Sequence, residues 1–179
     1  IPLRLVGSEM CIRDRVVAVT RSGRAATEGP AVGLADETVA VAELASVLPR
    51  AQALVLCCPL DDSTRGLIGA RQLALMPPGA LLVNVARAEV VDEEALYHAL
   101  TGGQLGRAAL DVWYSYPKAG QTPAPPSRWP LHELPNVRGT PHISAITPAL
   151  LERRYAFIAH NTMRVAQGLE PENVIYRSR

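Results

Sequence analysis

Short apolar runs alternate with amphipathic segments along this chain, and the clearest run covers residues 80–87. Its sequence, Ala-Leu-Leu-Val-Asn-Val-Ala-Arg, comes after Pro77, Pro78 and Gly79 and ends on a charged side chain. A continuous apolar run of this length, bounded by turn residues, is typical of a strand that is buried on both faces. The same pattern predicts further strands at residues 16–20, 53–58, 107–112 and 137–140.

Apolar positions spaced three and four residues apart predict helices between and after these strands, over residues 36–48, 69–75, 92–102 and 147–167. Asp92 is the predicted N-cap of the third helix. Thr147 followed by Pro148 predicts the start of the fourth, because proline is favoured at the first helical position. The intervening residues 114–136 contain six prolines, and so long a loop indicates a functional or interfacial role.

Strands that alternate with helices predict a parallel sheet with right-handed crossovers. The expected fold class is therefore α/β, an incomplete Rossmann-like doubly wound parallel sheet with a carboxyl-terminal helix. Five predicted strands are few for this fold, and we expect the sheet to lack a part.

Composition narrows the class of protein. The 179 residues suffice for one domain with a sizeable core. A formal net charge of +1 gives no broad basic field, so we expect neither a nucleic-acid nor a membrane partner. The three cysteines, Cys11, Cys57 and Cys58, have no metal-binding spacing, which predicts a reduced, cytoplasmic protein without a metal site.

Residues 1–15 fit poorly with the rest of the chain, because they have neither a strand period nor a helix period. We interpret them as a leader that is foreign to the fold, the alternative being a frayed natural terminus. The expected organisation is a leader over 1–15, a partial Rossmann-like domain over 16–146, and a helix and tail over 147–179.

Ionisable side chains lie at or just after the carboxyl ends of three of the predicted strands: Arg87, Asp111 and His142. Open α/β sheets bind ligands at the carboxyl ends of their strands, so these groups are expected to share one crevice. A structural interpretation stays open for each. Arg87 could pair with Glu89 or Asp92, Asp111 could cap a turn, and a lone histidine is often structural.

Five short motifs strengthen the functional interpretation: Cys58-Pro59-Leu60 with Thr64-Arg65-Gly66-Leu67-Ile68, Asn84-Val85-Ala86-Arg87, Val90-Val91-Asp92-Glu93-Glu94-Ala95-Leu96, Leu110-Asp111-Val112-Trp113 and Thr140-Pro141-His142-Ile143-Ser144. In these residues the chain resembles the D-isomer-specific 2-hydroxyacid dehydrogenases, in their NAD(P)-binding half. The resemblance covers residues 16 to about 174. The family's glycine-rich turn, expected just before Val16, and its amino-terminal substrate domain have no counterpart here.

The resemblance implies hydride transfer between a nicotinamide cofactor and a 2-hydroxy or 2-keto acid. Arg87 matches the substrate-binding arginine, whose rigid fork suits a carboxylate. His142 matches the acid/base histidine, and Asp111 matches an aspartate near the nicotinamide carboxamide.

One position departs from the family. Tyr116 replaces the glutamate that usually pairs with the histidine. A phenol brings no negative charge, so we expect His142 to be less readily protonated than is usual for the family. Three interpretations are open: Tyr116 orients His142, the proton comes by another route, or this branch does not reduce keto acids.

The resemblance also implies a set of cofactor-binding residues. Cys57, Cys58 and Pro59 form the wall beside the adenine ribose, and the set further contains Thr64, Val85, Ala86, Ser144 and Ala145, together with Arg87, Asp111 and His142. At the end of the first strand, Arg21 and Ser22 replace the acidic residue that NAD-using relatives place there. A cation favours the 2′-phosphate of NADP, so the hypothesis is NADP over NAD, the alternative being a solvated basic turn.

The expected function is a fragment of an NAD(P)-dependent oxidoreductase acting on a small 2-hydroxy or 2-keto acid, inactive by itself. A homodimer is expected for the full-length protein. The alternative is an NAD(P)-binding scaffold or sensor without turnover, for which the Tyr116 substitution leaves room.

Overall fold

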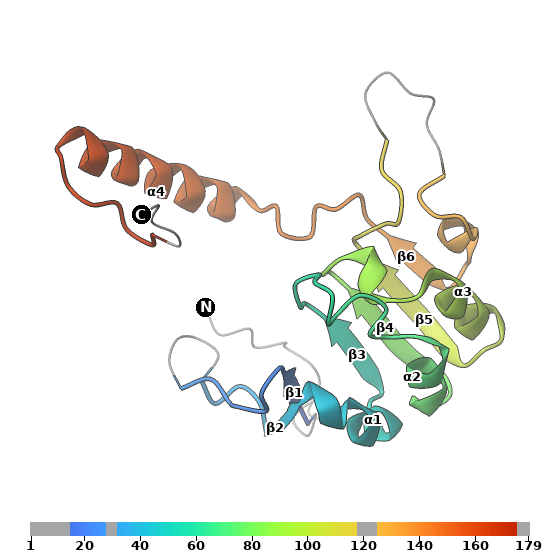
Figure 1. The fold of residues 1–179 in the computed structure, drawn as a ribbon. Helices are drawn as coiled ribbons and strands as arrows, with labels where there is room; N and C mark the ends of the chain where they lie inside the picture. The colour runs from blue at the N-terminus through green and yellow to red at the C-terminus, as the bar shows by residue number, and fades with distance from the viewer. Residues whose placement is uncertain (1–14, 28–31, 118–124, 175–179) are drawn as a thin grey trace, which may run out of the picture.

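The computed structural model describes residues 15–27, 32–117 and 125–174. Within these ranges the strands form two parallel sheets (Figure 1). The first pairs β1 (Val17–Thr20) with β2 (Glu37–Ala40). The second has the order β3-β4-β5-β6 and consists of β3 (Ala53–Leu56), β4 (Ala80–Asn84), β5 (Leu105–Leu110) and β6 (Val137–Gly139). All pairs are parallel, which confirms the predicted fold class.

Two helices cover one face of the four-stranded sheet, α2 (Ala70–Leu75) and α3 (Glu93–Thr101) (Figure 1). As predicted, Asp92 caps α3, since its carboxylate accepts the backbone N–H of Ala95 at 2.8 Å. Glu93 and Glu94 occupy the first turn, where the helix dipole favours negative charge. Short 3-10 turns complete this layer, at Ala88–Val90 and Leu131–Glu133.

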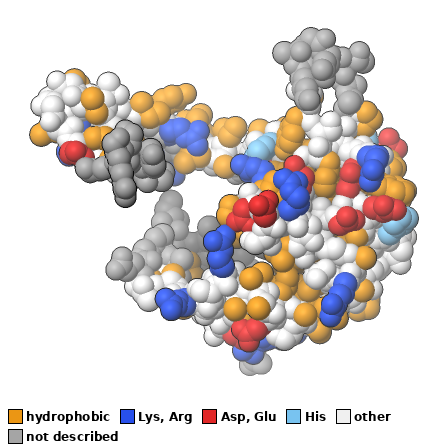
Figure 2. Space-filling view, in the orientation of Figure 1, with side chains coloured by type: hydrophobic (Ala, Val, Ile, Leu, Met, Phe, Trp, Pro, Cys, Tyr) orange, Lys and Arg blue, Asp and Glu red, His pale blue; other side chains and the backbone are white. Residues whose placement is uncertain are grey.

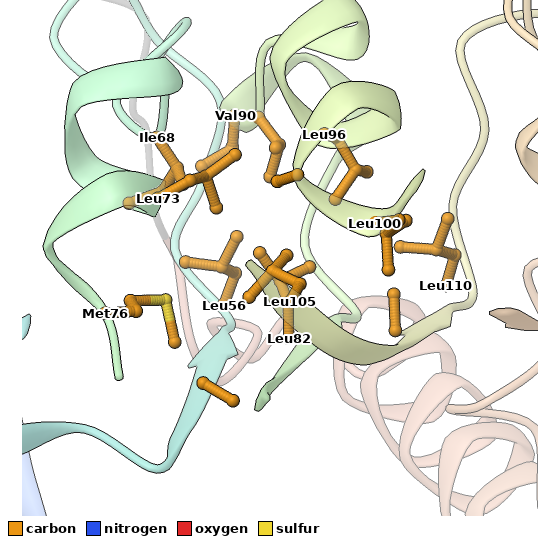
Figure 3. Close-up of a cluster of buried hydrophobic side chains, with 14 of the residues drawn as sticks. Leu56, Ile68, Leu73, Met76, Leu82, Val90, Leu96, Leu100, Leu105 and Leu110 are labelled. Atoms are coloured by element: carbon orange, nitrogen blue, oxygen red, sulfur yellow. The ribbon is translucent and has the colours of Figure 1, made fainter. Parts of the chain in front are cut away.

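The hydrophobic core lies between these helices and the sheet (Figure 3). Leu82 on β4 and Leu105 on β5 are fully buried, and Ile68, Leu73 and Leu96 cover them from the helical layer. Burying a leucine side chain contributes about 1.5–3 kcal/mol, so this cluster dominates the stability of the domain.

The other face of the four-stranded sheet is apolar but open among the described residues. Val55 on β3 is 57% exposed, and its partner Val83 on β4 is half-buried. Parallel sheets normally bury both faces. The described helices cover only one, so the fold is half of a doubly wound arrangement.

The described strands of the two sheets do not pair with each other. A doubly wound sheet has the strand order 3-2-1-4-5-6. In chain order, β1 and β2 match positions 2 and 3, and β3, β4 and β5 match positions 4, 5 and 6. A strand in the first position would therefore lie between β1 and β3, and among the described strands each of these two pairs with one other strand.

One predicted helix is wrong over its first part. Residues 36–48 were expected to be helical, whereas Glu37–Ala40 is β2. The β-branched Thr38 and Val39 favour an extended backbone, and pairing with β1 outweighs the helical spacing. The helical part begins only after β2. It consists of a 3-10 turn at Val41–Glu43, α1 (Leu44–Val47) and a second 3-10 turn at Leu48–Arg50.

The last helix, α4 (Pro148–Ala166), begins where the sequence predicts. The hydroxyl of Thr147 accepts the backbone N–H of Leu150 at 3.1 Å. No residue of α4 is buried, and the helix extends away from both sheets (Figure 1). Hydrophobic side chains lie along its surface (Figure 2), among them Phe157 and Ile158, which are 38% and 53% exposed.

Candidate active site

Asn84 organises the loop after β4. Its side chain is buried, donates to the backbone oxygen of Arg87 at 3.0 Å and accepts the backbone N–H of Ala86 at 3.0 Å. These two bonds fix the turn in which the strand ends. Ala86 is therefore buried, whereas Val85 and Arg87 are exposed at the carboxyl edge of the sheet.

The guanidinium of Arg87 is available for a ligand. It donates to the backbone oxygen of Ala86 at 2.6 Å and makes no ion pair with any carboxylate of the described residues. The alternative of pairing with Glu89 or Asp92 is not realised in this structure. A planar guanidinium without a carboxylate partner can bind the carboxylate of a ligand through two parallel hydrogen bonds.

Asp111, just past β5, ties the loop after β6 to the sheet. Its buried carboxylate accepts hydrogen bonds from the hydroxyls of Thr140 and Ser144 and from the backbone N–H groups of Ile143 and Ser144, at 2.5 to 3.1 Å. Burial by itself raises the pKa of this carboxyl, but the hydrogen bonds outweigh burial and lower the pKa to about 2. The charge thus holds together the loop that carries His142.

His142 has a strained backbone, with φ of 59°. This left-handed conformation is uncommon for residues other than glycine, and such outliers cluster at functional sites. On the carboxyl side of His142, hydrogen bonds from the backbone N–H groups of Ile143 and Ser144 to Asp111 hold the loop in place. The side chain is exposed at the same edge as Arg87 and Asp111, since all three come after neighbouring parallel strands.

Tyr116 holds the imidazole of His142. The phenol oxygen lies 3.3 Å from Nδ1 of His142 and accepts the backbone N–H of Trp113 at 3.0 Å. A hydroxyl has one proton and two lone pairs, so it can donate to a neutral imidazole or accept from a charged one. The contact is therefore compatible with either protonation state of the ring and adds no charge.

Trp113 contacts the backbone that leads from β6 to His142. Its indole N–H donates to the backbone oxygen of Thr140 at 3.0 Å. Its ring packs so closely on Gly139 that any side chain at that position would collide with it. Roles for Asn84, Trp113 and Thr140 were not predicted from the sequence, although a polar residue that ends an apolar run was a signal for Asn84.

The predicted wall of the cofactor site lies at the end of β3. Thr64 stabilises the loop that forms this wall. The Thr64 hydroxyl donates to the backbone oxygen of Pro59 at 2.7 Å and accepts the backbone N–H of Asp61 at 2.8 Å. Cys57 is exposed, and burial raises the pKa of the Cys58 thiol, which makes that thiol a poor nucleophile. These residues present backbone and apolar surface at the edge.

The remaining predicted residues are distributed along this edge. Arg21 comes after β1 and pairs with Asp61 at 2.9 Å, and Ser22 is exposed beside it. Ser144 donates its N–H and hydroxyl to Asp111, and Ala145 is exposed. The edge thus carries an exposed apolar side chain at Val85 and the guanidinium groups of Arg21 and Arg87.

Comparison with known proteins assigns the family. The model of the D-isomer specific 2-hydroxyacid dehydrogenase NAD binding domain matches residues 12–144. The chain belongs to this family. The match covers all strands of the structure and the residues Arg87, Asp111 and His142, and it ends before α4.

Among curated proteins, the chain is 38% identical over 135 residues to D-3-phosphoglycerate dehydrogenase of Methanocaldococcus jannaschii, covering 75% of this chain and 24% of that protein. It is 36% identical over 133 residues to glyoxylate/hydroxypyruvate reductase B of Pectobacterium atrosepticum, covering 74% of this chain and 39% of the relative. The chain therefore spans less than half the length of these curated relatives.

Solved structures of the family superpose on most of the chain. D-lactate dehydrogenase from Lactobacillus jensenii with NAD⁺ gives a TM-score of 0.72 at 29% identity, covering 91% of this chain and 48% of the other. A D-isomer specific 2-hydroxyacid dehydrogenase from Xanthobacter autotrophicus Py2, in complex with NADPH and MES, gives 0.66 at 30% identity, covering 90% and 60%. Relatives of this fold thus occur with either cofactor.

Two further features are absent from the described ranges. These ranges contain no group of three or more His, Cys, Asp or Glu side chains that could hold a metal ion. No helix within them has both the length and the apolar character needed to cross a bilayer.

Proposed function

We propose that this chain is the NAD(P)-binding part of an enzyme that transfers a hydride between the cofactor and a small 2-hydroxy or 2-keto acid. One observation carries the proposal. A guanidinium without a carboxylate partner in the described ranges, Arg87, and a strained, oriented imidazole, His142, lie at the same edge of the sheet. A scaffold that only binds nucleotide has no need of this pair.

Each side chain has a distinct part in the proposed reaction. The nicotinamide ring supplies or accepts the hydride. Arg87 binds the substrate carboxylate and polarises the neighbouring carbonyl. His142 gives a proton to the substrate oxygen in reduction and takes it back in oxidation. Tyr116 positions the ring of His142, and Asp111 positions the loop.

For the cofactor we propose the edge between β1 and β6. Cys57, Cys58, Pro59 and Thr64 flank the adenine ribose, and the nicotinamide end is lined by Val85, Ala86, Asp111, Ser144 and Ala145. Arg21 and Ser22, at the end of β1, favour NADP over NAD because no acid ends this strand. Relatives with NAD⁺ and with NADPH both exist, so the preference rests on this chain's own residues.

The domain organisation and assembly complete the proposal. We place the family's first strand and glycine-rich turn in the open position between β1 and β3. Residues 147–179, the carboxyl-terminal helix and tail, pack toward a substrate domain through the exposed face of α4, and the full-length protein is a homodimer. The free thiols of Cys57 and Cys58 support a cytoplasmic location. The proposed leader, residues 1–15, falls almost wholly outside the described residues.

The second candidate function is an NAD(P)-binding scaffold or sensor without turnover. Tyr116 favours it, because the phenol that holds His142 adds no negative charge. Binding of cofactor without reduction of any 2-keto acid would support this candidate.

The test is a reductase assay on the full-length protein with glyoxylate or pyruvate and either NADPH or NADH. Turnover is expected, and His142→Asn is expected to lower kcat by about 10²- to 10⁴-fold. Arg87→Gln should raise KM and lower kcat, whereas Arg107→Gln, an exposed arginine on β5, should change neither. Unchanged turnover in His142→Asn would refute the assigned role, and cofactor binding without turnover would refute the enzyme.

A further inference from the structure

An ion pair joins the carboxyl ends of the two sheets. Arg21 comes after β1, and Asp61 belongs to the loop after β3. Nη2 of Arg21 lies 2.9 Å from Oδ2 of Asp61. The second cation of the same turn, Arg24, is exposed and its guanidinium has no carboxylate partner in the described ranges. The two arginines of the proposed cofactor edge are therefore in different electrostatic states.

Asp61 is held in place independently of Arg21. Its Oδ1 accepts the hydroxyl of Ser63 at 2.5 Å and the backbone N–H of Ser63 at 2.9 Å. These hydrogen bonds, and then Arg21, hold the pKa of the Asp61 carboxyl below its usual range. At neutral pH the negatively charged carboxylate of Asp61 consequently faces the guanidinium of Arg21 at the end of β1.

We propose that Asp61 is a specificity-determining residue for the cofactor, one that reduces, without reversing, the preference for a 2′-phosphate that Arg21 provides, because the Asp61 carboxylate partly neutralises that guanidinium. The inference rests on the proposed dinucleotide function. NAD-using relatives achieve this discrimination with an acid at the end of the strand itself. Here the acid, Asp61, comes from the loop after a strand of the neighbouring sheet, 40 residues further along the chain. A phosphate dianion must either displace the Asp61 carboxylate from Arg21 or bind Arg21 while the two negative charges repel each other.

The test compares two nucleotides that differ only in the 2′-phosphate, adenosine 2′,5′-bisphosphate and adenosine 5′-monophosphate. Their dissociation constants are measured on the full-length protein by NMR titration. Asp61→Asn keeps an acceptor for Ser63 and removes the charge. It is expected to raise the preference for the bisphosphate by about 3- to 10-fold, with the monophosphate affinity unchanged and the gain reduced at high salt.

The matched control is Asp62→Asn. Asp62 is the next residue, is exposed, and makes no ion pair or hydrogen bond with the described residues. Its replacement changes the net charge equally, so its preference ratio should stay within about twofold of the wild type. Asp61→Ser provides a second neutral variant, whose gain should equal that of Asp61→Asn.

The outcomes separate this inference from the proposed function. If the monophosphate binds and neutral residues at 61 leave the preference unchanged or lower it, Asp61 is not a specificity residue, while the nucleotide site stands. If the wild-type full-length protein binds neither nucleotide, the proposed site fails and this inference fails with it. An equal gain in Asp62→Asn would assign the effect to net charge and also overturn the inference.

Discussion

The four-stranded sheet and the two-stranded sheet of this protein have the same local structure but different support. Both consist of short parallel strands. Leu82 and Leu105 of the larger sheet are fully buried under α2 and α3, whereas every residue of β1 and β2 is half-buried or exposed. Strand pairing alone therefore does not make a core, and covered faces carry the stability.

The largest expected effect is in the covered region. Leu82→Ala should lower the free energy of unfolding by about 2–5 kcal/mol, because it removes buried methyl groups and leaves a cavity. Val19→Ala on β1, where the side chain is 38% exposed, should cost well under about 1 kcal/mol. Urea unfolding followed by circular dichroism measures both. Equal losses would contradict the comparison.

The next effect concerns Asp111. Asp111→Asn should cost roughly 2–3 kcal/mol, because it removes the charge that accepts four N–H and O–H donors. The folded pKa of about 2 lies below the unfolded value of about 3.9. The contribution of this carboxylate is therefore present above about pH 4 and is lost as the pH falls toward 2. Unfolding measured across that window should show a flatter pH dependence in the variant.

A smaller effect separates two helix caps. Asp92→Ala should lower global stability by about 1 kcal/mol, since α3 packs on the core. Thr147→Ala removes an equivalent cap from α4, which has no buried residue. We expect this change to speed amide exchange in α4 and to leave the urea midpoint of the sheet unaltered. A shifted midpoint would show that α4 contributes to the core.

The smallest effect is expected on the open face of β3. Val55→Thr keeps the β-branched shape and should change the free energy of unfolding by less than about 0.5 kcal/mol, because Val55 is already 57% exposed. In a longer protein that covers this face, the same substitution should cost more than about 1 kcal/mol. The two measurements together test whether further segments of a longer protein cover this face of the sheet.

Local patterns were sufficient for most elements and for the position of the site. The apolar run that forms β4, the cap of α3 and the start of α4 each depend on neighbouring residues, and all are observed. Because parallel strands end at one edge, their order along the chain also placed Arg87, Asp111 and His142 on the same side. β2 was missed because Thr38 and Val39 lie within a helical spacing.

The finer geometry of the site depends on contacts between distant residues. Asp111 is 29 to 33 residues from the donors that surround it, and Arg21 is 40 residues from Asp61. The left-handed backbone of His142 lies in the loop that the first of these sets holds to the sheet. Such contacts become visible only when the strands are placed side by side.

Among the described strands, β1 and β3 each have one edge without a pairing partner, and this has a practical consequence for handling the domain. Rows of backbone N–H and C=O groups along such edges invite extended segments of other molecules. We expect the isolated domain to self-associate through these rows as its concentration rises. A short parallel segment supplied in trans should suppress that association more effectively than added salt.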